Sequence, residues 1–237
     1  MSNINITTIT FGTTIEPREI QCFRGAIVRS MGTDSDVLLH NHTDEGLRFS
    51  YPMVQYKVNR KKPQIVAIGD VAQRIKSFLN QNPLELTIGD HKQHFEVEEI
   101  QEKPYSPSFS EEPKLYSIRN YIALTSKNHT EYHSILALTD RIQFVEHVLV
   151  GNILSFLKGI GYHSDEKIYL AITSIDGTPI VRYKGIRFET FDLHFVCNIN
   201  LPDNIGLGKS SSVGFGKISK VNHIADSPWK DKNDYRK

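Results

Sequence analysis

The sequence predicts an α+β fold made of two successive β-α-β-β-α-β units, and three observations support this prediction. Segments with alternating apolar and polar residues recur in both halves of the chain. A helix pattern follows the first such segment in each half. A stretch rich in proline, serine and glutamate, residues 101–114, reads as the connection between the halves. With 237 residues and 39% hydrophobic content, the chain is long enough for two small domains with buried cores.

In the first half, residues 3–11 alternate as a half-buried strand does. Glu16-Pro17 then favours a helix start, with an apolar face at Ile20, Phe23, Ile27 and Met31. Two apolar segments follow, separated by a basic turn, and Asp70 can cap a second helix that ends before Pro83. The expected strands after the first helix are 51–58, 64–68, 84–88 and 91–100.

In the second half, residues 139–158 have the pattern of a long amphipathic helix that ends at Gly159 and Gly161. Asp176-Gly177 indicates a hairpin. Residues 201–205 allow one helical turn, and strands are expected at 121–125, 167–175, 179–183, 187–199 and 213–221. The prediction is two tandem ferredoxin-like domains, 1–104 and 105–237, each an antiparallel sheet with helices on one face, a layout shared with RNA-recognition modules.

Composition narrows the class of protein. The net charge of +1 argues against a protein that coats nucleic acid indiscriminately, although basic residues cluster at 57–62 and 209–220 and could line a local groove. No apolar run is long enough to span a membrane, and no signal peptide is evident. Cys22 and Cys197 lie far apart, in elements that look half-buried. Reduced core cysteines in a cytoplasmic protein are therefore expected.

The most informative segment is Gly206–Ile218, G-L-G-K-S-S-S-V-G-F-G-K-I, with no acidic residue between Ile205 and Ala225. Glycines let successive backbone N–H groups converge on an anion, and serines and lysines add donors. A nucleotide-binding P-loop is disfavoured because Asp203 stands where its first glycine is needed and a strand, not a helix, is expected to follow. No dinucleotide-binding G-x-G-x-x-G is present. A flexible surface loop remains the alternative.

Four segments together resemble a known family. They are F-R-G-A at 23–26, L-L-H-N-H at 38–42, Y-P-M-V-Q-Y-K at 51–57 and the glycine-rich segment at 206–216. The chain resembles the CRISPR-associated repeat-processing endoribonucleases, and more narrowly the b subgroup of the sixth Cas family. The resemblance implies metal-independent cutting of CRISPR repeat RNA to release guide RNAs, without a cofactor. CRISPR repeat RNA is the expected partner, and other subunits of a CRISPR complex and a second copy of the chain are further candidates.

The chemistry expected of the site depends on two histidines. If the segment is extended, His40 and His42 project to the same face, so both imidazoles can flank one phosphodiester as acid and base. The ribose 2′-OH would attack its own phosphorus, giving a 2′,3′-cyclic phosphate and a 5′-OH, and DNA would not be cleaved. Which histidine is the base stays open. Lys57 is the candidate for stabilising phosphorane charge, and Tyr51 or Tyr56 is a candidate for orienting the ribose.

The candidate RNA-binding residues come from the first helix and the glycine-rich segment. Phe215, between two glycines, could stack on a base or pack in the core. The full set is Arg24, Arg29, Gly206, Gly208, Lys209, Ser210, Ser211, Ser212, Gly214, Phe215 and Gly216.

The sequence leaves three alternatives to this function. A guide-RNA-holding subunit without catalysis would keep the glycine-rich segment but not need the histidine pair. A nucleotide-binding enzyme would need the phosphate motifs excluded above. A metal site is not expected, because neither cysteine has a ligand nearby in sequence; His129 and His133 are four apart and would share a helix face, but without H-E-x-x-H.

Overall fold

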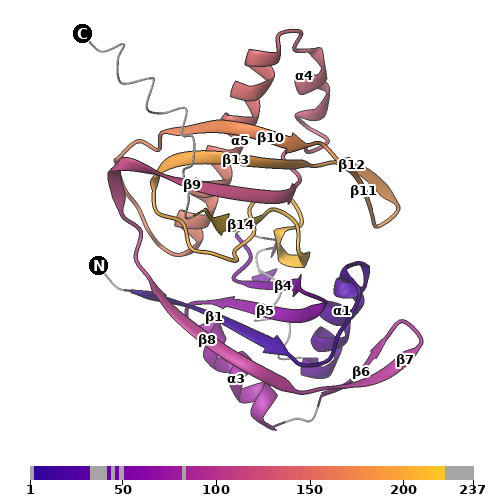
Figure 1. Ribbon diagram of the computed structural model, residues 1–237. Coiled ribbons are helices and arrows are strands. Elements are labelled where there is room, and N and C mark those ends of the chain that lie inside the picture. The colour runs from indigo at the N-terminus through magenta and orange to yellow at the C-terminus, as the bar shows by residue number, and fades with distance from the viewer. Residues whose placement is uncertain (1–2, 33–41, 44–45, 48–50, 82–83, 222–237) are drawn as a thin grey trace.

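The structure is a computed structural model that describes residues 3–32, 42–43, 46–47, 51–81 and 84–221. Two four-stranded antiparallel sheets lie one above the other (Figure 1). A continuous stretch of chain runs from the last strand of the N-terminal sheet into the first strand of the C-terminal sheet. No helix in these described ranges is both long and apolar enough to cross a bilayer.

The N-terminal sheet has the strand order β4-β5-β1-β8, which is the order of a ferredoxin-like fold. The helices α1 and α3 cover the face of this sheet that is turned away from the C-terminal sheet (Figure 1). Two short hairpins, β2-β3 and β6-β7, are additional. The elements are β1 (Ile4–Phe11), η1 (Pro17–Glu19), α1 (Ile20–Met31), β2 (His42–Thr43), β3 (Gly46–Leu47), β4 (Val54–Asn59), β5 (Lys62–Ile68), α3 (Val71–Gln81), β6 (Leu84–Ile88), β7 (His91–Phe95) and β8 (Val97–Tyr105).

Because side chains alternate along each strand, the two faces of the N-terminal sheet pack against different parts of the protein. In β5, Ile65 and Ala67 join the core formed with α1, whereas Val66 and Ile68 join a core whose other members come mostly from the C-terminal domain. The same alternation sends Tyr56 of β4 toward α1 and its neighbours Gln55 and Lys57 toward the C-terminal domain. The second face of this sheet is therefore an interdomain interface.

The C-terminal sheet has the equivalent order, β10-β13-β9-β14. The long helix α5 packs on it through Val145, Leu149, Ile153 and Phe156. A hairpin, β11-β12, stands outside the four-stranded sheet. The elements are β9 (Phe109–Tyr121), α4 (His129–Ser134), α5 (Leu138–Gly159), β10 (Leu170–Gly177), β11 (Ile180–Tyr183), β12 (Ile186–Glu189), β13 (Phe191–Ile199), η3 (Ser211–Val213) and β14 (Lys217–Lys220).

The predicted α+β fold with two tandem ferredoxin-like sheets is confirmed, and so are the helices at 20–31 and 138–159. The predicted linker at 101–114 is wrong in extent, because most of it belongs to β8 and β9. Its proline and glutamates suit β8, an edge strand whose residues before Tyr105 are all exposed. The strand expected at 121–125 ends instead at Tyr121.

Two further predictions in the second half are wrong. Asp176-Gly177 does not turn a hairpin, because β10 pairs with β13 through Gly177. The hairpin turns instead at Lys184-Gly185, where both residues have positive φ, 49° and 79°, as a type I′ turn requires. The helical turn expected at 201–205 is absent. The connection between β13 and β14 contains only the 3-10 turn η3, so the second α-helix of this unit is replaced by the glycine-rich segment.

Of the two cysteines, Cys197 is buried as expected, whereas Cys22 is exposed on α1; both are free.

Candidate functional site

The segment Gly206–Gly216, called the glycine loop from here on, lies where the two domains meet. The Gly206 N–H donates to Gln55 Oε1 at 2.7 Å, and the Tyr51 hydroxyl donates to the Gly206 carbonyl at 2.8 Å. Gln55 Nε2 in turn donates to the Tyr51 hydroxyl at 2.8 Å. The three residues form a closed, buried ring of hydrogen bonds. The N-terminal domain thus fixes the first residue of a loop that belongs to the C-terminal domain.

Glycine is required in this loop by close backbone approach. Gly216 has a φ of +61°, and a Cβ there would stand 1.9 Å from the Leu207 carbonyl oxygen. Gly208 has a φ of +83°, and its Cβ would stand 2.6 Å from the Tyr121 ring. Both positions combine a left-handed backbone with contacts that leave no room for a side chain. The glycines therefore fold the loop tightly against the C-terminal domain.

The loop uses several of its backbone N–H groups internally. Those of Leu207, Lys209, Val213 and Gly216 donate to backbone carbonyls of the protein. The expectation that successive N–H groups all converge on an anion is therefore wrong for these four. Serine hydroxyls are the donors placed at an opening instead. A cavity of about 360 Å³ is lined by Ser210, Ser211 and Ser212 together with Tyr51, Pro52, Asn152, Ser155 and Gly208.

Lys57 lies behind the glycine loop rather than on the surface. Its residue exposure is 1%, and its Nζ has no hydrogen-bond partner within the described part of the chain. A Cβ added to Gly206 would lie 3.0 Å from Lys57 Nζ, 2.8 Å from the Phe215 carbonyl and 2.9 Å from the Ser211 carbonyl. The amino group therefore lies close to the backbone of Gly206. Burial, aided by the charge of Lys217, lowers the pKa of Lys57 to about 7.

This lowered pKa predicts how stability depends on pH. Between pH 7 and 10.5 the unfolded chain keeps a proton that folded Lys57 has lost, so the free energy of unfolding rises with pH. Lys57→Met should be more stable than the wild type by about 2 to 4 kcal/mol at pH 7, and the difference should shrink toward pH 10. Urea denaturation across this range measures it, with Lys127→Met as the exposed-lysine control. Parallel stability curves for wild type and Lys57→Met would contradict the burial argument.

The helix that carries the predicted RNA contacts, α1, lies next to the glycine loop. Both α1 and β4 contact η3, the 3-10 turn within the glycine loop. Arg24 is half-buried and close enough to Tyr56 to affect the pKa of that tyrosine, whose rise is caused mainly by burial. Arg29 is exposed near the C-terminal end of α1. Neither arginine forms an ion pair with another described residue.

Sequence reasoning missed the hairpin β11-β12 as part of this site. Its half-buried face packs on the glycine loop: the Tyr183 and Phe215 rings are 5.3 Å apart, and Lys209 Nζ lies 4.6 Å from the centre of the Phe188 ring. Phe215 thus packs against protein, one of the two roles foreseen for it. The opposite face presents Arg182 and Arg187, which are exposed. The available signal was a pair of arginines, Arg182 and Arg187, which lie directly opposite each other in the hairpin.

The histidine pair can be placed only in part. His40 lies outside the described residues. His42 begins β2 and pairs with Leu47 of β3, so the backbone is extended there as expected, but its side chain also lies outside the description. In chain order, the segment that carries both histidines leads directly into Tyr51 and Pro52, which line the cavity beside the loop serines.

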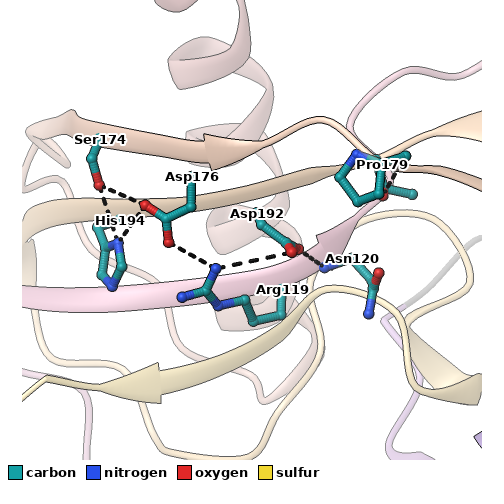
Figure 2. Close-up of polar contacts among 8 residues, drawn as sticks. Arg119, Asn120, Ser174, Asp176, Pro179, Asp192 and His194 are labelled. Carbon is teal, nitrogen blue, oxygen red and sulfur yellow. Dashed lines mark hydrogen bonds and ion pairs between the residues drawn. The ribbon is translucent and has the colours of Figure 1, made fainter.

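A second polar cluster lies on the C-terminal sheet and does not have the geometry of a catalytic triad. Figure 2 shows Ser174, Asp176 and His194, where both Ser174 Oγ and Asp176 Oδ1 contact the same ring nitrogen of His194, at 3.1 and 3.3 Å. A triad needs the acid and the nucleophile on opposite nitrogens. Arg119 joins Asp176 to Asp192 across the strands. The cluster is a surface network of hydrogen bonds and ion pairs.

Comparisons with known proteins agree with this architecture. The family model for the Cas6b N-terminal domain matches residues 2–106, and the model for the Cas6b C-terminal domain matches residues 108–221. A crystal structure of Cas6b superposes with a TM-score of 0.80 at 25% identity, over 93% of this chain and 100% of that one. A crystal structure of the CRISPR RNA processing endoribonuclease Cas6b gives 0.71 at 23% identity, over the same shares.

One curated relative also matches. An uncharacterised protein of Methanocaldococcus jannaschii is 36% identical over 104 residues, which are 44% of this chain and 69% of the relative. The two family models together account for nearly all of the described residues, including both domains and the glycine loop. The chain therefore belongs to the Cas6b family.

Proposed function

We propose that this protein is a metal-independent endoribonuclease that cuts CRISPR repeat RNA and releases guide RNAs. One observation carries the proposal. The chain matches Cas6b along both domains, and its glycine loop is tied to the N-terminal domain at Tyr51, where the segment bearing His40 and His42 rejoins the sheet. A loop that offers hydroxyl and lysine donors thereby meets the N-terminal domain at a residue only nine positions after His42 in the sequence.

The RNA strand follows the positive and hydroxyl-bearing groups around this junction. Arg24 and Arg29 come from α1, the loop serines line the cavity, and Lys209 is exposed at its outer side. The arginines of β11-β12 extend the positive surface beyond the loop. These groups neutralise phosphates and position the RNA strand. Because the net charge is only +1, the attraction for RNA comes from this local positive charge.

In the reaction, one neutral imidazole of the His40 and His42 pair takes the proton from a ribose 2′-OH. The 2′ oxygen bonds to the adjacent phosphorus, and the bond between phosphorus and the 5′ oxygen breaks. The other imidazole, protonated, donates its proton to that leaving oxygen. The products are a 2′,3′-cyclic phosphate and a 5′-OH, so the RNA supplies its own nucleophile.

Tyr51 and Lys57 act through the glycine loop in this proposal. Tyr51 is 5% exposed and its hydroxyl is committed to Gly206 and Gln55, while Lys57 is enclosed behind the loop. Tyr51 is therefore a positioning residue that holds the loop backbone at Gly206, whereas Lys57 lies behind the loop with no hydrogen bond to another described residue. Direct contact between Lys57 and a phosphorane would require the loop to move away.

The test is end-group analysis of a repeat RNA incubated with the purified chain in EDTA. We expect a 2′,3′-cyclic phosphate on the upstream fragment and a 5′-OH on the downstream fragment. A matched RNA with one 2′-deoxyribose at the cleaved linkage should bind and stay intact. Bound but uncut normal RNA would instead identify a guide-RNA-holding subunit. Fragments with 5′-phosphate ends, or cleavage only with added Mg²⁺, would refute the mechanism.

A further inference from the structure

Three side chains outside the proposed RNA site converge beside α4. His129 and His133 lie one helical turn apart on α4, and their ring centroids are 4.4 Å apart. Glu189, at the end of β12, approaches from a different element, with its Oε2 3.2 Å from His133 Nε2. One ligand atom from each residue lies within 4.8 Å of the other two. The fold has therefore gathered two imidazoles and a carboxylate at one point.

This arrangement has the dimensions of a metal centre. Metal–ligand bonds of about 2.0 to 2.2 Å in a tetrahedral site place neighbouring ligand atoms roughly 3.3 Å apart. The pair formed by His133 and Glu189 is already at that distance, and rotation of the His129 side chain would bring the third atom in. Two histidines and one carboxylate suit Zn²⁺ and related borderline cations, with water as a fourth ligand.

The elements that carry the ligands are held firmly. Tyr132, between the two histidines, is buried and its ring packs against Phe144 and Phe191. Beside Glu189, Thr190 is fully buried and donates from both its N–H and its hydroxyl to the Pro179 carbonyl, at 2.9 Å each. Both sides of the cluster are thus preorganised, although His129 and His133 are themselves exposed and accessible to a cation in solution.

We propose that His129, His133 and Glu189 form a binding site for one Zn²⁺-class cation that links α4 to the base of the β11-β12 hairpin. Phe188, the neighbour of Glu189 on the opposite face of β12, contacts Lys209 of the glycine loop. The bound cation would therefore fix the orientation of a hairpin that touches the loop. The role is structural and separate from the chemistry proposed for His40 and His42, so the two proposals fail independently.

The experiment measures binding of Zn²⁺ and Co²⁺ alone to the full, tag-free chain without RNA. Competition with a chromophoric chelator gives affinity and stoichiometry, and the visible spectrum of Co²⁺ reports tetrahedral coordination. The variants are His129→Ala, His133→Ala and Glu189→Gln. His91→Ala, an exposed histidine on β7, is the matched control, and the double variant His40→Ala/His42→Ala tests the other histidine pair.

We expect one Zn²⁺ per chain, with affinity at least tenfold weaker in each of the three variants and unchanged in both controls. Zn²⁺ should also slow hydrogen exchange at 186–189 and raise the melting temperature of the wild type but not of His129→Ala. A concentration of 0.1 mM Zn²⁺ is on the order of a hundred times the dissociation constant expected of a useful site. No binding at that concentration would overturn the proposal. Binding that survives the three substitutions would overturn it too.

Discussion

His40→Ala is expected to lower the rate of repeat RNA cleavage by about 10² to 10⁴-fold while RNA binding persists. A positioned acid or base contributes that much to a proton transfer, and alanine leaves the phosphate-binding groups of the glycine loop in place. His42→Ala should act similarly. The double variant should be little worse than either single one, because residues that work as a unit are not additive. Single-turnover cleavage in EDTA, with binding measured separately, is the assay.

The pH dependence of the same variants tests whether the histidines titrate in the reaction. The wild type should show a bell-shaped profile, and each single variant should lose one limb, which would also assign the acid and the base. His91→Ala, at an exposed position of the hairpin β6-β7, should keep both rate and profile. If His40→Ala and His42→Ala cleave at the wild-type rate, the assignment of the active site is refuted.

The sequence was sufficient for the elements whose signals are local. The turn between β4 and β5 was foreseen from its basic residues, and Arg60 and Lys61 indeed adopt φ of 48° and 65°. The helix α5 was foreseen from its apolar stripe. The glycine-rich segment was singled out because glycines at such density signal close backbone approach, and Gly208 and Gly216 show that approach.

The sequence was insufficient where pairing between distant strands decides the outcome. Asp176-Gly177 is a good turn signal, but β10 gains more from pairing with the buried strand β13, and the Asp176 carboxylate binds Ser174, His194 and Arg119 instead. Lys184-Gly185 turns the hairpin with a weaker signal. Local propensity gave way to tertiary contacts in both places.

The burial of Lys57 could not be predicted from the sequence either. As part of a basic cluster it looked exposed, yet β4 alternation sends Asn59 and Lys57 to the same face, and only Lys57 is covered by the glycine loop. The burial depends on a loop about 150 residues later in the chain. Its neighbours Tyr51 and Gln55 bind Gly206 across the same interface. The candidate site is therefore a property of how the two domains pack.

The close approach of backbone segments within the glycine loop allows a sharp mutational test. Gly216→Ala should lower the free energy of unfolding by about 4 kcal/mol or more, a loss that only severe steric conflicts produce. Its Cβ would stand 1.9 Å from the Leu207 carbonyl oxygen, and the same two residues share a hydrogen bond, Leu207 N to Gly216 O at 2.9 Å. Neither partner can shift without breaking that bond. The displaced loop should also bind repeat RNA more weakly.

Gly214→Ala is the matched control, because it imposes the same kind of positive-φ strain without the clash. Gly214 has a φ of +92°, and the nearest atom to its added Cβ is the Tyr56 carbonyl oxygen at 3.8 Å. Strain alone should cost about 1 to 2 kcal/mol. Urea denaturation of the two variants, followed by RNA binding at a fixed salt concentration, separates the effects. Equal losses of stability in both would mean that conformational strain, and not the contact with Leu207, is what makes glycine necessary at position 216.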